Sequence, residues 1–328
     1  MIRRFLKLSN PRQLASRRQR PLRQPPLPLD QRVHAITLRS AALGIRKRFY
    51  LYTPPHYTAT QHPLPTLYLF RGHEQEWINP QQDSQRNNRT VVDVYEELLR
   101  AGAVGPMILV FPGISSADNG VPGLLVNFKQ PEVQPKPGVG RGRFQDYFLH
   151  ELVPYVDAHY RTDPGRRGTD GFSLGGFMAT KIAAQYPALF RTAGAYDGLF
   201  FWDDPTDGVN IAATDLTFAN PIFDPAFGAG PDRDRRYAAA NNALNLVRRA
   251  EPALLRKVTW LIEYGPESGE PHDSNFYRGH RLCKLLASKG VHNQGRGELA
   301  SGSHSWWWAD EHMRHVLPLH WQALSAQR

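Results

Sequence analysis

A serine set between glycines, in residues 170–176 (D-G-F-S-L-G-G), constrains the fold of this chain more than any other feature. The spacing G-x-S-x-G is typical of a sharp turn from a strand into a helix, with Ser173 at its tip. Glycines flank the tip because side chains there would collide, and because so tight a turn strains the backbone. A helix of small residues is expected to follow, from Gly175 to Tyr186, where Pro187 ends it.

Strands alternate with helices along the rest of the chain. Apolar runs predict buried strands at 66–70, 107–111, 190–196 and 258–264, with a weaker strand at 294–299. Helical patterns lie between and after them, at 91–101, 144–160, 242–249, 277–288 and 306–323. Two further strands, 33–38 and 46–52, come first and are joined by a short hairpin-like link. This order predicts one α/β domain over residues 30–328, with a mostly parallel central sheet flanked by helices and with N-terminal antiparallel strands.

His304 is distinguished from the other histidines by its position. It lies in a loop, 302–305, after the last predicted strand and before the last predicted helix. In an α/β-hydrolase sheet the chain order of a catalytic triad is serine, acid, histidine, and the histidine follows the final strand. A serine hydroxyl is a weak nucleophile that needs a base beside it. Ser173 and His304 are therefore the candidate nucleophile and base.

The candidate acid belongs to the loop that follows the predicted strand 258–264. The carboxyl end of that strand opens toward the same edge of the sheet as the serine turn. Three carboxylates lie in this loop, those of Glu267, Glu270 and Asp273. Glu267 is the preferred candidate because it is nearest to the strand end, where a rigid element can hold it. Glu270 and Asp273 remain as alternatives.

A developing oxyanion needs hydrogen-bond donors that are fixed in advance. The backbone N–H of Leu174, one residue after the serine, is the first candidate donor. The second is expected in the loop 71–73 after the third strand, where the backbone N–H of His73 is the candidate.

Basic residues are concentrated at the start of the chain. The net charge is +10, and residues 1–29 hold eight basic residues and no acidic one. Several prolines in this stretch predict a flexible or polyproline-like tail. A solvated tail, a transit peptide and an arm for anionic surfaces stay open as alternatives. The remainder is close to neutral, so nucleic acid is not an expected partner.

No apolar run approaches the roughly 18 residues of a membrane span. An apolar stretch of the kind found in secretory signals does not follow the basic residues either. The expected location is cytoplasmic, with the transit-like tail as the one contrary indication. His312 and His315 are three apart on a predicted helix, but no third ligand accompanies them, and we expect solvated or capping histidines rather than a metal site.

Four motifs, in order along the chain, resemble those of the putative esterase family of α/β-hydrolases. This family holds feruloyl esterases, S-formylglutathione hydrolases, enterochelin esterases and mycolyltransferases. The similar stretches are 65–72 with Trp77 beyond it, 150–157, the serine turn 171–176, and 304–306 with Trp308. Two positions depart from the pattern: Asp170 takes a place that is usually apolar, and the acid loop carries extra residues.

The resemblance implies an α/β-hydrolase fold and a serine carboxylesterase that works without a cofactor on a small-molecule ester. Ser173 would attack the ester with His304 as base and Glu267 orienting the imidazole, and water would resolve the acyl-enzyme. Acyl transfer to an alcohol is the nearest alternative, and a binding protein on a hydrolase fold is the alternative from another class. The aromatic residues expected to line the substrate site are Trp77, Phe200, Trp202 and Trp306.

Overall fold

The computed structural model describes residues 33–59, 61–200 and 220–326. The basic segment 1–29 and Trp202 lie outside these residues. Within the described part of the chain, no helix is both long enough and apolar enough to cross a membrane.

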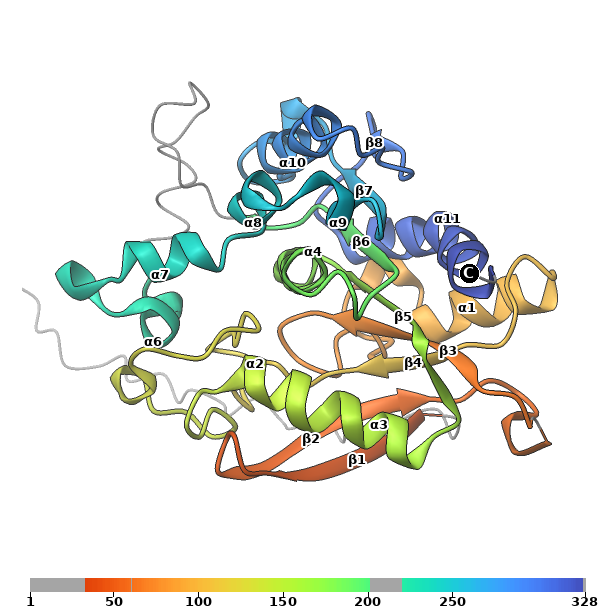
Figure 1. The fold of residues 1–328 in the computed structure, drawn as a ribbon, viewed down its shortest axis with the longest axis horizontal. Coiled ribbons are helices and arrows are strands. Elements are labelled where there is room, and N and C mark those ends of the chain that lie inside the picture. The colour runs from red at the N-terminus through yellow and green to blue at the C-terminus, as the bar shows by residue number, and fades with distance from the viewer. Residues whose placement is uncertain (1–32, 60, 201–219, 327–328) are drawn as a thin grey trace, which may run out of the picture.

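An eight-stranded sheet runs through the molecule in the order β1-β2-β4-β3-β5-β6-β7-β8 (Figure 1). The β1–β2 and β2–β4 pairs are antiparallel and the remaining neighbours are parallel. The strands are β1 (Val33–Ser40), β2 (Ile45–Tyr52), β3 (Leu64–Phe70), β4 (Ile108–Phe111), β5 (Thr162–Gly171), β6 (Thr192–Tyr196), β7 (Thr259–Tyr264) and β8 (Gly297–Glu298). The expected mostly parallel sheet with N-terminal antiparallel strands is confirmed.

Helices cover both faces of this sheet, which is why β3, β4 and β6 are buried along their whole length. On one face, α1 (Val91–Arg100) lies beside the C-terminal helix α11 (Trp306–Ser325) (Figure 1). On the other face lie α3 (Val153–His159), α4 (Leu174–Gln185), α8 (Ala243–Arg249) and α10 (Phe276–Ser288). Shorter helices are α2 (Phe144–Asp146), α6 (Asp224–Phe227), α7 (Arg235–Ala240) and α9 (Pro252–Leu255).

The helix expected over 144–160 is present but is not a regular α-helix. It begins as α2, continues as a π-helical turn over Tyr147–Leu152 and ends as α3. Pro154 follows the π-helical turn inside one continuous helical backbone, since Leu152 and Val153 both have helical dihedrals. The irregularity therefore precedes the proline and is a π-helical turn.

β5 is the strand that the sequence predicts least clearly, because Asp170 interrupts its apolar character. The Asp170 side chain is fully buried between β5 and α11. Its carboxylate oxygens lie 3.1 and 3.2 Å from Nε2 of His312, and one of them lies 2.9 Å from Nε2 of His320. Gly194 on the neighbouring strand leaves room for this carboxylate, since a Cβ there would lie 1.8 Å from Asp170 Oδ2.

His312 continues the buried network to β7. Its Nδ1 lies 2.9 Å from Glu263 Oε2, and Nδ1 of His315 lies 2.7 Å from Glu263 Oε1. Burial alone would lower the pKa of His312, but Asp170 and Glu263 together outweigh it and raise that pKa to about 9. The expectation of a solvated histidine was thus wrong for His312. Among the described residues, no group of three or more side chains could hold a metal ion.

Candidate active site

The turn between β5 and α4 has the strained geometry that its glycines predict. Ser173 has φ 57° and ψ −116°, a conformation that residues with side chains rarely adopt. A Cβ on Gly175 would lie 1.9 Å from the Phe70 carbonyl oxygen, and one on Gly171 would lie 2.3 Å from the Gly175 carbonyl carbon. Close packing of β3 against Gly175, and of Gly175 against Gly171, thus leaves no room for side chains at these positions. The surrounding structure holds the serine in its strained conformation.

His304 is placed by the start of α11 and by the strand next to the serine. Ser305, the next residue, is the N-cap of α11, and the backbone N–H of His304 donates to the Asp273 carbonyl at 2.8 Å. The Tyr196 hydroxyl donates to the Ser303 carbonyl at 2.6 Å. The imidazole packs on Phe172, the residue before the serine, with ring centres 4.7 Å apart. These contacts bring His304 to the serine turn.

The carboxylate in contact with His304 belongs to Asp197, which is the first residue after β6. Asp197 Oδ2 lies 2.5 Å from Nδ1 of His304, and the Asp197 side chain is fully buried. Its Oδ1 accepts hydrogen bonds from the backbone N–H groups of Gly265 at 3.1 Å and of Asn275 at 2.8 Å. The Asn275 amide also donates to the Asp197 backbone carbonyl at 2.9 Å. Asp197 is therefore held by hydrogen bonds to its side chain and its backbone while it contacts the imidazole.

The three carboxylates expected from the loop after β7 have other partners. Glu267 Oε1 accepts from the Tyr277 hydroxyl at 2.6 Å on the exposed surface. Glu270 Oε1 accepts from the backbone N–H of Tyr277 at 3.1 Å, at the start of α10. Asp273 contributes its backbone carbonyl, which holds the His304 backbone. The choice of Glu267 is corrected accordingly: the acid beside the imidazole is Asp197, because the β7 loop brings backbone donors to this point instead of a carboxylate.

A usable signal for Asp197 is present in the sequence. Asp197 directly follows a predicted buried strand, and Gly198 comes next, as is typical where a chain turns sharply at a strand end. Its φ of 44° is one that aspartate tolerates better than most residues. Asp197 is absent from the acid candidates above because these come only from the loop after the strand predicted at 258–264.

His304 packs on the residue before Ser173 but forms no hydrogen bond with Ser173 in this structure. Within the described part of the chain, no hydrogen bond joins the Ser173 hydroxyl to another residue, and the Ser173 side chain is almost buried. Its backbone N–H donates to the Tyr196 carbonyl at 3.0 Å, which fixes the turn to the end of β6 beside Asp197. Hydrogen bonds of this kind often tighten only when a substrate is bound.

Of the two N–H groups expected to bind the oxyanion, one is free of a helix partner and the other already has an acceptor. The Leu174 N–H is the first amide of α4, and the leading amides of a helix have no partner within it. The His73 N–H donates to Glu76 Oε1 at 2.6 Å. The same carboxylate oxygen accepts from the Asn119 amide at 3.1 Å. His73 could serve as an oxyanion donor only if Glu76 released its N–H.

The aromatic residues expected around the substrate are mostly buried. Trp77 is 1% exposed and donates through its indole N–H to the Phe70 carbonyl at 2.9 Å. Its ring meets Trp306 edge to face at 5.0 Å, and Trp306 is also buried. Phe200 is fully buried in the core on the α4 face. The expectation that these rings line a substrate site is corrected for Trp77 and Phe200, which have almost no exposed surface. Trp202 lies outside the described residues.

With this geometry in view, the chain can be compared with known families. The model of the family described as Putative esterase matches residues 40–252. The chain belongs to the putative esterase family. The resemblance inferred from the four sequence motifs is therefore confirmed.

Curated relatives of this esterase-family chain include two mycobacterial proteins and one from Bacillus. Esterase Rv1288 of Mycobacterium tuberculosis is 28% identical over 209 residues, which is 60% of this chain and 41% of the relative. The uncharacterized protein YbbA of Bacillus subtilis is 19% identical over 180 residues, covering 51% of this chain and 62% of the relative. This chain thus spans about two fifths of the mycobacterial esterase and under two thirds of YbbA.

Solved structures of esterases and related proteins share the fold. A ferulic acid esterase superposes with a TM-score of 0.65 at 21% identity, over 89% of this chain and 98% of that one. An S-formylglutathione hydrolase from Agrobacterium tumefaciens gives 0.63 at 18% identity, over 89% and 95%. MPT51 of Mycobacterium tuberculosis gives 0.61 at 15% identity, over 89% and 98%. The esterase-family chain has the α/β-hydrolase fold, as expected.

Proposed function

We propose that this chain is a serine carboxylesterase in which Ser173, His304 and Asp197 form the catalytic triad. The observation that carries the proposal is the contact of 2.5 Å between Asp197 Oδ2 and His304 Nδ1, beside a serine in a strained strand-to-helix turn. Nucleophile, base and acid come from three distant parts of the chain, and a chance meeting of these groups is not expected. Membership of the esterase family supports the same activity.

The chemistry follows from the position of each group. The Ser173 hydroxyl oxygen attacks the ester carbonyl carbon while Nε2 of His304 takes its proton. Asp197 accepts the Nδ1–H hydrogen bond, which fixes the tautomer and stabilises the imidazolium that forms. The negative charge on the former carbonyl oxygen is stabilised by the N–H of Leu174.

Two further steps complete the turnover. When the tetrahedral intermediate collapses, its bond to the alcohol oxygen breaks and His304 returns the proton to that oxygen. Water then attacks the acyl-enzyme with His304 again as base, and the carboxylic acid and the free serine are released. No cofactor enters any of these steps.

The Asp197 environment suits this role because it fixes the direction of the carboxylate. Two backbone N–H groups hold Oδ1, and this leaves Oδ2 directed at the imidazole. The two donors are backbone groups next to regular elements, since Gly265 directly follows β7 and Asn275 directly precedes α10. Rigid support of this kind keeps a catalytic pair within the narrow geometry it needs.

The test is turnover of p-nitrophenyl acetate, with the mass of the intact chain followed in the first turnovers. We expect hydrolysis by the wild-type chain and one transient acetyl group on Ser173. Ser173→Ala should lose both, whereas Ser288→Ala, at an exposed serine of α10, should keep both. Equal rates for the wild-type chain and Ser173→Ala would overturn the proposal.

A further inference from the structure

Arg71 is the first residue after β3, and its side chain lies beside the proposed nucleophile. The guanidinium carbon is 5.0 Å from the centre of the Phe172 ring and 5.7 Å from that of Trp306. Phe172 directly precedes Ser173, and its ring also contacts the His304 imidazole, with ring centres 4.7 Å apart. Arg71 thus shares with His304 the aromatic ring that supports the serine.

The Arg71 guanidinium is held on one edge only. Its Nε lies 3.3 Å from Glu76 Oε2, whose other oxygen is held by the His73 N–H and by Asn119. The Nε atom is buried, and its contact with Glu76 is an ion pair without a hydrogen bond. Within the part of the chain that the structure describes, the two Nη groups have no ion-pair partner. The Arg71 side chain as a whole is 18% exposed, so solvent reaches part of it.

A guanidinium in this state favours an anionic partner. Burial lowers the pKa of Arg71, and the Glu76 carboxylate only partly opposes this. The two aromatic rings stabilise the cation from the side, but they supply no hydrogen-bond acceptor for the Nη edge. A carboxylate matches that edge with two parallel hydrogen bonds, which are stronger than neutral ones.

We infer that Arg71 binds a carboxylate carried by the substrate, so that the preferred substrates are esters with a free carboxyl group. This inference rests on the proposed function, because it places the carboxylate of a bound ester beside Ser173. Arg71 acts here as a specificity residue: it binds the substrate and takes no part in proton transfer. The alternative is that Arg71 has a structural role only and stabilises the loop after β3 through its ion pair with Glu76.

The experiment compares two esters that differ at one end, mono-p-nitrophenyl adipate and p-nitrophenyl hexanoate. They have the same acyl chain length and leaving group, and only the first carries a carboxylate. For the wild-type chain, we expect kcat/KM to favour the adipate ester by about tenfold or more. A ratio at or below one would overturn the inference, and this measurement does not depend on the folding of any variant.

Variants then assign the preference to Arg71. Arg71→Gln should reduce the adipate-to-hexanoate ratio at least tenfold, mainly through KM for the adipate ester, and Arg71→Lys should restore part of it. A ratio that Arg71→Gln leaves unchanged would favour the bracing role and contradict the inference.

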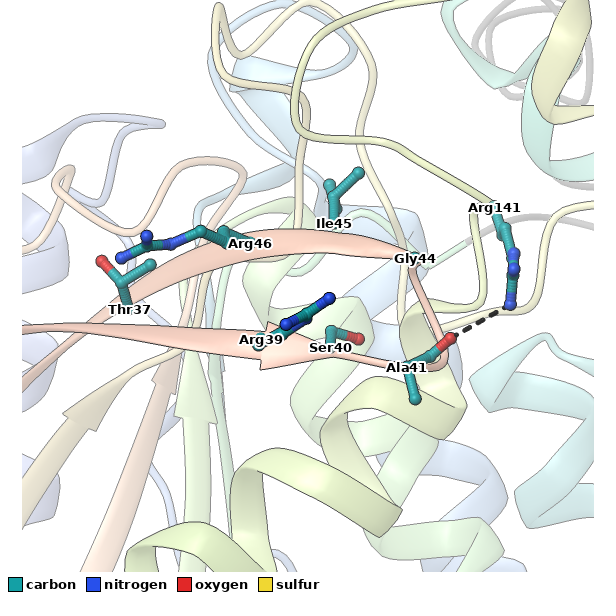
Figure 2. Close-up of a pocket in the computed structure, with 8 residues that line it drawn as sticks. All are labelled: Thr37, Arg39, Ser40, Ala41, Gly44, Ile45, Arg46 and Arg141. Atoms are coloured by element: carbon teal, nitrogen blue, oxygen red, sulfur yellow. Dashed lines mark hydrogen bonds between the residues drawn. The ribbon is translucent and has the colours of Figure 1, made fainter.

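A matched control removes the same charge at a distance from the serine. Arg46 is an exposed residue of β2 that lines an open groove of about 830 Å³ together with Arg39 and Arg141 (Figure 2). Arg46→Gln should leave kcat/KM for both esters, and their ratio, unchanged. A fall in this ratio equal to that of Arg71→Gln would assign the preference to net charge and contradict the inference. Failure of the proposed function looks different, since the wild-type chain would then hydrolyse neither ester faster than Ser173→Ala.

Discussion

Asp197 meets His304 at 2.5 Å from the end of β6, the strand that lies directly beside the serine strand β5. The loop after β7, where an acid was expected, supplies two backbone N–H groups to the same carboxylate. The segment after β6 thus supplies the carboxylate, and the loop after β7 orients it. This division has a consequence for stability as well, because removing the Asp197 carboxylate leaves buried donors without an acceptor.

The buried His312 predicts a loss of stability as pH rises. Its pKa is about 9 in the folded chain, above the ordinary value of about 6.5 in the unfolded chain. The stabilisation from the charged imidazole is therefore complete below about pH 6.5 and disappears as pH rises through about 9. The free energy of unfolding of the wild-type chain, minus that of His312→Gln, should fall by roughly 3 kcal/mol over this range.

Urea denaturation at several pH values measures this difference. His34→Gln, at an exposed position of β1, is the control and should give a difference that does not change with pH. If the free energies of unfolding of His312→Gln and of the wild-type chain changed equally from pH 6.5 to 9, His312 would not be the charged bridge between Asp170 and Glu263.

Lys181 predicts a pH dependence of the opposite sign. It is fully buried in α4, and burial lowers the pKa of its ammonium group to about 7. The unfolded chain keeps this proton up to about pH 10.5, so it binds more protons than the folded chain between these values and stability rises with pH. Above pH 7, the free energy of unfolding of the wild-type chain, minus that of Lys181→Met, should rise by up to about 1.4 kcal/mol per pH unit.

The same denaturation series tests this slope. Lys257→Met, at an exposed lysine before β7, serves as the control that removes a charge without a buried cavity. A wild-type advantage over Lys181→Met that declines above pH 7 would contradict the account. Nζ of Lys181 donates to the Leu125 carbonyl at 2.7 Å and to Gln145 Oε1 at 2.6 Å. The neutral amine keeps two N–H donors, so at high pH the variant should be less stable because it loses these hydrogen bonds.

The buried ion pair of Arg86 should contribute much more to the free energy of unfolding than an exposed ion pair does. Its Nε and Nη2 lie 2.8 and 2.9 Å from the two carboxylate oxygens of Asp310, and the Arg86 side chain has no exposed surface. Lysine cannot form this fork, so Arg86→Lys should lower the free energy of unfolding by about 3 kcal/mol or more. Arg89→Lys, in the exposed pair with Glu97, should change it by less than about 1 kcal/mol.

Thermal and urea denaturation of the two variants give the comparison directly. Arg86 also donates to the carbonyls of Glu76 and Trp77, and so ties the loop after β3 to α11. Equal losses for Arg86→Lys and Arg89→Lys would show that the buried fork contributes no more than a surface pair.

The sequence predicts those features that depend on local pattern. The serine turn follows from its glycines, and the sheet follows from apolar runs that alternate with helical ones. His304 is the proposed base because it lies between the last strand and the last helix. Each of these depends on neighbours that are close in sequence.

The features that the sequence missed depend on contacts between distant residues. Asp197 and His304 are 107 positions apart, and which carboxylate reaches the imidazole is decided by how two loops pack. Asp170 looks unsuitable for a central strand until His312, 142 positions away, is placed against it. A charged residue can be assigned to a core only when its partner is known.

The most direct test of the account compares Asp197→Asn with Glu267→Gln in hydrolysis of p-nitrophenyl acetate. We predict that Asp197→Asn lowers kcat by about 10³–10⁴-fold, because the imidazole loses the acceptor that fixes its tautomer. Glu267→Gln should stay close to the wild-type rate, since its carboxylate meets the Tyr277 hydroxyl at the surface. A large loss with Glu267→Gln, together with a wild-type rate for Asp197→Asn, would contradict the assignment of the acid.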